Sequence, residues 1–211
     1  MYVPHFNAVS DDAEIRAMVA AVGAGQLVTT GADGYPLATL LPLLWEGDTV
    51  RMHLARANPH WQAITESPEG TPALIVVSGA QAYISPSWYA SKPEHGRVVP
   101  TWNYSGVHLL GRARVTHDAD WLLRAVDDLV VAHESGRAEP WATSDAPEKY
   151  VRGQLRAIVG VEFAVERVDG KAKLSQNRSE ADQQGVVAGL RAEPVPDAGV
   201  VADQMAARLT D

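Results

Sequence analysis

Residues 26–54 read QLVTTGADGYPLATLLPLLWEGDTVRMHL, and this stretch decides the fold. It holds three segments rich in strand-forming residues: Gln26–Thr30, Leu37–Trp45 and Thr49–Leu54. The first two are separated by a turn containing Asp33-Gly34, which is a strong hairpin signal, and Glu46-Gly47-Asp48 forms the next turn. Strands joined by such short turns run antiparallel, so the sequence predicts an antiparallel meander.

The flanking sequence adds further strands and a long segment without regular structure. The additional strands are expected at Ala73–Ser78, Gln81–Ser85, Val107–Thr116, Leu155–Val168 and, after a turn at Asp169-Gly170, at Lys171–Ser175. Residues 86–104 contain Pro86, Pro93, Gly96 and Pro100 and are expected to be irregular.

Helices are indicated by their capping residues. Asp11 with Glu14 three positions later has the capping-box spacing, and Asp118 and Ser179 are the expected caps of two later helices. Val201, Met205 and Leu209 are four residues apart and predict an amphipathic helix at the end of the chain.

The predicted fold class is mainly β with inserted helices, antiparallel, with a helical C-terminal part. Small antiparallel sheets tend to close into barrels because closure removes exposed edges. We expect the barrel domain over residues 1–175 and a C-terminal helical extension over residues 176–211.

The composition excludes several classes of protein. The 211 residues contain no cysteine, which excludes disulfides, thiolate metal sites and cysteine nucleophiles. The formal net charge of -8 is opposite to that of proteins that grip nucleic acid through phosphates. No long apolar stretch predicts a membrane span and the N-terminus does not read as a secretory signal, so the expected location is the cytoplasm.

Common catalytic and nucleotide-binding motifs are also absent from the sequence. There is no G-x-G-x-x-G after a strand, no P-loop and no H-E-x-x-H. His53, His60 and His133 are candidate metal ligands, but lone histidines are more often structural, and no metal is expected.

Three constellations remain. In Met52–Pro59, backbone N–H groups at a helix start together with Arg56 suit a phosphate. The alternative is an Asn58 cap followed by proline, with Arg56 in solvent.

The second constellation, Trp88–Tyr104, is aromatic. The chain has 6 Trp and 6 Tyr, and four of these twelve fall in this segment: Trp88, Tyr89, Trp102 and Tyr104. Lys92, Arg97, Thr101 and Asn103 are interleaved with them. Flat rings beside polar donors suit a planar heterocycle, and they equally suit a dimer interface.

The third constellation, Lys171–Arg178, is a run of donors after a strand. It favours an anion contact or, equally, a solvated loop that caps the next helix.

Several strings along residues 1–190 resemble the PaiB-type family of FMN-binding negative transcriptional regulators. They are MYVPHF at 1–6, HLARANP at 53–59, YISPSWY at 83–89, VPTWNY at 99–104, SDAP at 144–147, AIVG at 157–160 and KLSQNR at 173–178. The strings occur in the same order as in the family. We recognise no string of the family in residues 191–211.

The resemblance implies a split β-barrel that binds FMN without a covalent link, as a homodimer with the flavin at the subunit interface. By analogy, His53, Leu54, Arg56 and Asn58 would contact ribityl or phosphate. Thr101, Trp102 and Asn103 would approach the flavin, and Lys173, Gln176 and Arg178 would line the ligand side. Trp88 and Lys92 complete the candidate cofactor-binding residues.

The family label implies a regulator, yet direct DNA binding is weakly supported because there is no helix-turn-helix signature and the net charge is negative. The alternative is an FMN-dependent oxidoreductase using NAD(P)H or a small substrate. A third reading is a barrel that has switched to haem, with His53, His60 or His108 as axial ligand.

Overall fold

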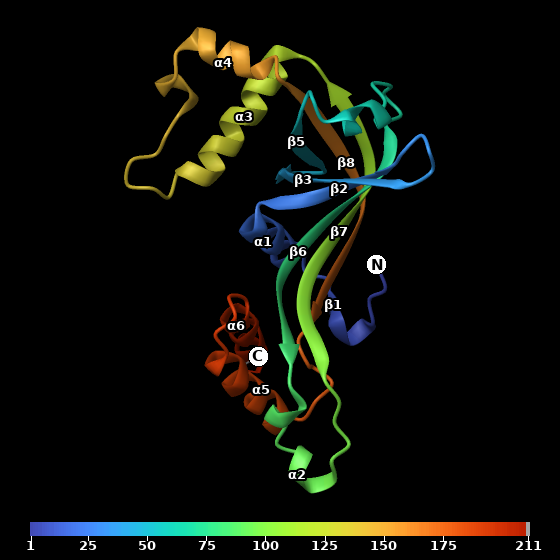
Figure 1. Cartoon of the computed structure of the whole chain (residues 1–211), viewed down its shortest axis with the longest axis vertical. Helices are drawn as coiled ribbons and strands as arrows, with labels where there is room; N and C mark the ends of the chain where they lie inside the picture. Colours follow the sequence, from blue (N-terminus) through green and yellow to red (C-terminus); the bar gives the residue numbers. More distant parts are fainter. Residues whose placement is uncertain (210–211) are drawn as a thin grey trace. The chain divides into compact units, whose positions relative to one another are not determined.

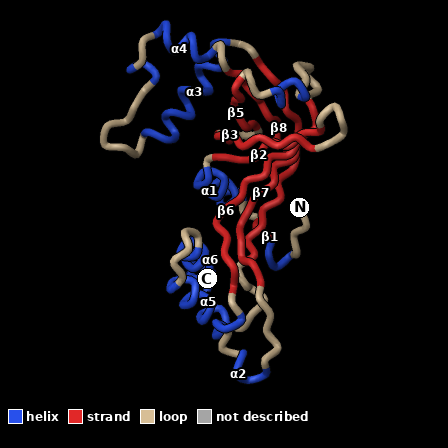
Figure 2. The backbone as a smooth tube through the Cα atoms, in the orientation of Figure 1, coloured by secondary structure: helices blue, strands red, loops and turns tan. Residues whose placement is uncertain are grey.

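The computed structural model describes residues 1–209, and a mostly antiparallel sheet of eight strands dominates it (Figures 1 and 2). The strands are β1 (Ala8–Val9), β2 (Ala24–Thr30), β3 (Pro36–Pro42), β4 (Leu44–Glu46), β5 (Thr49–Ala55), β6 (Thr71–Ile84), β7 (Thr101–Thr116) and β8 (Ile158–Lys173). Their order is β3-β2-β6-β7-β8-β5-β4, and β1 pairs with β8. The mainly β, antiparallel class expected from the sequence is therefore confirmed.

Helices are inserted between the strands and follow the last one. Within residues 1–209 they are α1 (Asp12–Val22), α2 (Lys92–His95), α3 (Ala119–Glu134), α4 (Glu148–Leu155), α5 (Glu180–Ala192) and α6 (Ala198–Leu209). Short 3₁₀ helices occur at His5–Asn7, Pro59–Ala63, Pro86–Trp88 and Thr143–Asp145. Figure 1 shows α5 beside α6, a pair that packs together and forms the predicted helical C-terminal part.

The predicted meander is present as two hairpins. β2 pairs with β3 around the Asp33-Gly34 turn, and β4 pairs with β5 around Gly47. The predicted single strand Leu37–Trp45 is divided, because the backbone N–H of Leu43 donates to the carbonyl of Gly23 at 3.0 Å between β3 and β4.

The helix caps are confirmed by their hydrogen bonds. The carboxylate of Asp11 accepts from the backbone N–H of Glu14 at 2.7 Å, and that of Asp118 accepts from the N–H of Trp121 at 2.6 Å. Ser179 accepts from the N–H of Asp182 at 3.2 Å. Each cap satisfies a backbone donor that the first helical turn leaves without a partner.

Some predicted chain breaks are wrong. β8 runs without interruption through Asp169-Gly170, because Gly170 pairs with Val9 of β1. A Cβ at Gly170 would lie 2.9 Å from the carbonyl oxygen of Val9. The glycine therefore allows β1 and β8 to approach closely, and it does not form a turn. Likewise β6 is continuous, and the irregular segment ends at Thr101, where β7 begins.

The chain forms two compact units. Unit 1 contains Met1–Met18, Ser78–Val107 and Asp169–Asp211, and unit 2 contains Val19–Val77 and His108–Val168. Unit 2 has a core that includes Leu27, Met52, Leu54, Ile75 and Phe163, and unit 1 has a core that includes Ile84, Leu174, Val186, Leu190 and Met205. Each of β6, β7 and β8 contributes residues to both units. Over residues 1–209, none of the helices combines the length and apolarity that a membrane crossing needs.

Candidate functional site

The residues predicted to bind a cofactor belong to both units, and each unit is described by itself. His53, Leu54, Arg56 and Asn58 lie in unit 2, and Trp88, Lys92, Thr101, Trp102, Asn103, Lys173, Gln176 and Arg178 lie in unit 1.

Two of the unit 2 residues, His53 and Leu54, are on β5. Leu54 is 1% exposed, so its side chain belongs to the core. The Nδ1 atom of His53 is buried and has no hydrogen-bond partner in the described chain. Burial lowers the pKa of His53 from its ordinary value, which favours the neutral imidazole.

Arg56 is anchored where β5 ends. Its backbone N–H donates to the carbonyl of Ala157 at 2.7 Å. Its Nε donates to the carbonyl of Arg156 at 2.8 Å, and its Nη2 donates to that of Ile158 at 3.0 Å. Nη2 also lies 3.4 Å from Nδ1 of His117. No partner within residues 1–209 takes the remaining nitrogen, Nη1, so the guanidinium is held in place and still has free donors.

Arg56 lines a pocket in this unit that has a cavity volume of about 510 Å³. Its other lining residues are His117, Ala119, Leu122, Arg152, Leu155 and Arg156. Arg152 is paired with Glu148 at 2.6 Å, and Nε2 of His117 lies 3.5 Å from a carboxylate oxygen of Glu66. The side chain of Arg156 makes no ion pair or hydrogen bond in the described structure. The pocket thus combines unneutralised positive charge with an apolar wall, which suits an anionic ligand.

Asn58 caps the 3₁₀ helix Pro59–Ala63, which is the structural alternative to a phosphate contact. Its Oδ1 accepts from the backbone N–H of His60 at 3.0 Å, and its Nδ2 donates to Thr39 at 3.3 Å. Both ends of the amide are therefore used inside the protein.

In unit 1 the structure brings Thr101, Trp102 and Lys173 together. The ammonium of Lys173 donates to the hydroxyl of Thr101 at 2.5 Å and to the carbonyl of Trp102 at 2.9 Å. The indole of Trp102 is 47% exposed, donates to Gln81 at 3.1 Å and meets Tyr83 edge to face at 6.4 Å. Trp102 is the exposed one of the four aromatic residues in the predicted segment Trp88–Tyr104, and its exposed neighbour Tyr83 precedes that segment.

Asn103 and Gln176 make local bonds. Asn103 is fully buried, and its Nδ2 donates to Ser175 at 2.9 Å and to the sulfur of Met205 at 3.4 Å. The amide of Gln176 accepts from the N–H of Leu174 at 2.7 Å and donates to the carbonyl of Ala172 at 2.5 Å. These contacts fix the reversal of the chain between β8 and α5, where Ser175 has a positive φ of 64°.

The remaining three predicted residues contact neighbouring groups of unit 1. Lys92 donates to the hydroxyl of Ser87 at 3.0 Å. The guanidinium of Arg178 lies 4.8 Å from the centre of the Tyr89 ring. The indole of Trp88 packs against α5, where a Cβ on Gly189 would lie 2.3 Å from it.

Sequence reasoning missed His117, Arg152 and Arg156 as pocket residues. The spacing of Arg152 and Arg156 places both on one side of a helix, and that spacing was the available signal. Their proximity to Arg56 depends on the pairing of β5 with β8 and could not be read from spacing.

Comparison with known proteins gives a family match, curated relatives and solved structures with a similar fold. Residues 1–167 match a family described as "Putative FMN-binding domain". The chain is 33% identical over 213 residues to the Bacillus subtilis "Protease synthase and sporulation protein PAI 2", which covers 99% of this chain and 98% of that protein. It is also 35% identical over 171 residues to an uncharacterized protein of Aspergillus fumigatus, covering 67% and 66% of the two chains.

Two solved structures share the fold at low sequence identity. A FAD and haem binding protein from Mycobacterium smegmatis is 19% identical, with a TM-score of 0.60, over 87% of this chain and 80% of that one. The flavocytochrome Anf3 from Azotobacter vinelandii is 20% identical, with a TM-score of 0.56, over 80% and 70%. The family match supports FMN as the cofactor, and the chain belongs to this FMN-binding domain family.

Proposed function

We propose that this chain is an FMN-binding regulatory protein of the PaiB type, and that the phosphate of FMN binds in the unit 2 pocket. The observation that carries the proposal is the unpaired guanidinium of Arg156 in the same pocket as the uncommitted Nη1 of Arg56. Two guanidinium groups supply the planar donors that a phosphate accepts, so the residues present fit the phosphate end of FMN.

The size and walls of the pocket agree with this use. Its volume of 510 Å³ lies within the range of about 300–1,000 Å³ that is typical of small-molecule sites. Ala119, Leu122 and Leu155 offer apolar surface beside the charged groups. The cofactor is held without a covalent bond in this proposal, and the flavin itself supplies the redox chemistry when bound.

The fold proposal is a split β-barrel, assembled as a homodimer with flavin at the interface. The two structural relatives support it, because both are named for flavin binding and share the fold. The exposed rings of Tyr83 and Trp102 favour an interface, since aromatic residues are enriched where proteins associate. Thr101, Trp102 and Lys173 of unit 1 stay predicted flavin contacts, and the phosphate proposal does not depend on them.

The regulatory role rests on the relative from Bacillus subtilis, whose name is "Protease synthase and sporulation protein PAI 2". A net charge of -8 argues against strong non-specific affinity for DNA. We therefore propose that regulation acts through a metabolite or a protein partner, and that direct DNA contact is at most weak.

The test compares FMN with riboflavin, which lacks the phosphate. Replacing Arg156→Gln should weaken FMN binding by about tenfold, because a charge-assisted hydrogen bond is lost. Riboflavin affinity should be unchanged. Titrations followed by flavin fluorescence measure both.

The matched control is Arg137→Gln, since Arg137 is an exposed arginine of unit 2 that pairs with Glu134 and does not line the pocket. Equal FMN affinity in wild type and Arg156→Gln would refute the phosphate site. Steady NAD(P)H oxidation in air by the FMN-loaded protein would instead favour an oxidoreductase, and a Soret band in the purified protein would favour haem.

A further inference from the structure

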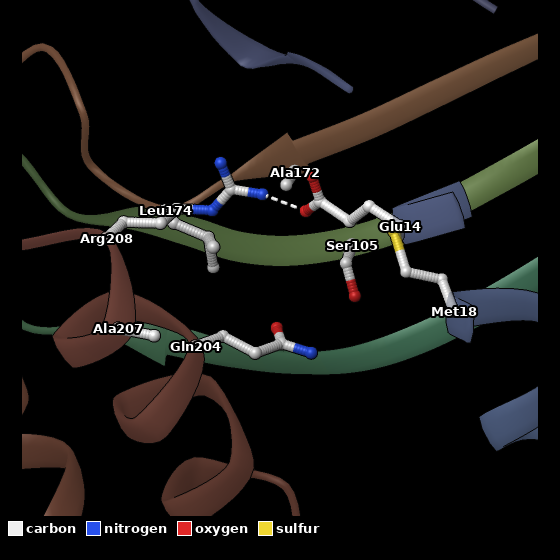
Figure 3. A pocket seen from close by; sticks show the side chains of 8 residues that line it. All are labelled: Glu14, Met18, Ser105, Ala172, Leu174, Gln204, Ala207 and Arg208. Carbon is white, nitrogen blue, oxygen red and sulfur yellow. Dashed lines mark hydrogen bonds and ion pairs between the residues drawn. The ribbon is translucent and has the colours of Figure 1, made fainter. Parts of the chain in front are cut away.

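A second pocket lies within unit 1, and none of the predicted FMN residues lines it. It has a cavity volume of 270 Å³. Figure 3 shows the side chains that line it: Glu14, Met18, Ser105, Ala172, Leu174, Gln204, Ala207 and Arg208. They come from α1, β7, the end of β8 and α6. α6 lies beyond residues 1–167, so this pocket includes a part of the chain that the FMN-binding family model does not cover.

One uncharged polar group of the pocket is buried without a partner among residues 1–209. The Oε1 atom of Gln204 is buried and accepts no hydrogen bond from any described residue. Ser105 is 5% exposed and lines the same pocket. Figure 3 shows the Ser105 hydroxyl and the Gln204 amide directed into the same space. Buried polar groups are nearly always paired, so the Gln204 oxygen calls for a ligand with a hydrogen-bond donor of its own.

A pair of opposite charges lies at the same pocket. The guanidinium of Arg208 on α6 is paired with the carboxylate of Glu14 on α1 (Figure 3). Both side chains are partly exposed, at 34% and 43%. A cation and an anion held side by side match a small ligand that itself carries one carboxylate and one ammonium group.

The rest of the wall is apolar and limits the ligand. Met18, Ala172, Leu174 and Ala207 supply this surface. At about 30 Å³ for each water molecule, the volume corresponds to roughly nine waters, which limits the site to a small ligand.

We infer that this pocket binds a free α-amino acid with an apolar side chain. The carboxylate of the ligand pairs with Arg208 and its ammonium pairs with Glu14. The apolar side chain lies against Met18 and Leu174, and the Ser105 hydroxyl and Gln204 amide bind the polar end. The inference uses only unit 1 and does not depend on FMN.

The experiment is calorimetric titration of the FMN-free full-length chain with leucine. Two analogues separate the charged groups: isocaproate lacks the ammonium, and isoamylamine lacks the carboxylate. Leucine should bind, and each analogue should bind at least about tenfold more weakly because one charge-assisted contact is missing. No heat with leucine or other apolar amino acids, or equal binding of isocaproate, would overturn the inference.

Variants locate the site. Arg208→Gln and Glu14→Gln should each weaken leucine binding by about tenfold or more. Glu14→Gln leaves the cap of α1 intact, because Asp11 binds the backbone N–H of Glu14 and not its side chain. The matched control is Arg191→Gln, which breaks the Arg191–Asp203 pair between α5 and α6 at 3.0 Å without touching the pocket.

Arg191→Gln should keep wild-type affinity for leucine, and thermal unfolding checks that all three variants fold. Equal losses in all three would contradict the assigned site. FMN binding is titrated on the same protein, which separates the two proposals. If leucine binds and FMN does not, the amino-acid site is supported and the phosphate site is refuted.

Discussion

The imidazole of His60 is bound on both of its nitrogens. Nε2 lies 2.8 Å from the hydroxyl of Thr29, and Nδ1 lies 2.8 Å from the hydroxyl of Thr39. The side chain is 3% exposed, and burial lowers its pKa from the ordinary value of 6.5. His60, a candidate metal or haem ligand by sequence, is thus a buried residue with both ring nitrogens hydrogen-bonded, and it joins the β2–β3 hairpin to the 3₁₀ helix Pro59–Ala63.

The lowered pKa of His60 predicts a pH dependence of stability. Below about pH 6.5 the unfolded chain takes up a proton that the folded chain resists. The free energy of unfolding should therefore be highest above that pH and decrease as the pH falls toward the folded-state pKa. Urea unfolding of the wild type on either side of about pH 6.5 measures this decrease.

The variant His60→Gln should be less stable by about 1–3 kcal/mol above that pH, because it disturbs buried hydrogen bonds. It should also lose less stability on acidification. Some dependence should remain, since burial lowers the pKa of His53 as well. A variant as pH-sensitive as the wild type would show that His60 is not the responsible group.

At the scale of elements, two glycines of α5 allow this helix to pack closely against Trp88, which precedes α2. A Cβ on Gly185 would lie 2.1 Å from the carbonyl oxygen of Trp88, and a Cβ on Gly189 would lie 2.3 Å from its indole ring. Asp182, on the same helix, accepts from the N–H and from the hydroxyl of Ser91, both at 2.9 Å. Burial opposes ionisation of Asp182, but these hydrogen bonds outweigh it and hold its pKa below the ordinary value.

The close contact predicts that Gly189→Ala destabilises the protein even though alanine favours helices by about 1 kcal/mol over glycine. The indole of Trp88 would have to move, at a cost of about 1–3 kcal/mol that is typical of overpacking. Thermal unfolding measures the effect. The control is Gly199→Ala in α6, where a Cβ meets nothing within 4 Å, so stability should be unchanged or slightly raised.

The elements that the sequence predicted correctly are those with local signals. Asp11, Asp118 and Ser179 cap helices as their positions indicate, and Asp33-Gly34 forms its hairpin. The misplaced break at Asp169-Gly170 has a non-local cause. The local sequence Asp-Gly is the same whether the glycine forms a turn or lets a neighbouring strand such as β1 approach closely. Only the pairing with β1 distinguishes the two cases.

At the scale of the whole molecule, the proposed boundary between residues 1–175 and 176–211 can be tested by truncation. Met205, Asp182 and Arg178 lie after that boundary and contact Asn103, Ser91 and Tyr89 before it. A chain ending at residue 175 should therefore lose protection in Ser78–Val107, while Val19–Val77 changes little. Hydrogen exchange followed by mass spectrometry measures both segments, and unchanged protection in both would support an independent domain over residues 1–175.

The candidate site was less predictable than the fold, because it depends on distant residues meeting. Arg56 was recognised from its position after a strand, yet Arg152 and Arg156 join it only through the register of β5 and β8. Lys173 and Thr101 were both named from separate segments, and the structure joins them at 2.5 Å. Residue type and local spacing identified individual donors, whereas tertiary pairing decided which donors share a pocket.

The anchoring of Arg56 has a consequence for the entropy of binding. A free arginine side chain has about 2 kcal/mol of rotamer entropy to lose when a ligand fixes it. In this chain the carbonyl oxygens of Arg156 and Ile158 have already fixed the guanidinium. An anion arriving at Nη1 meets a preorganised donor, and its affinity is not reduced by the cost of ordering that side chain.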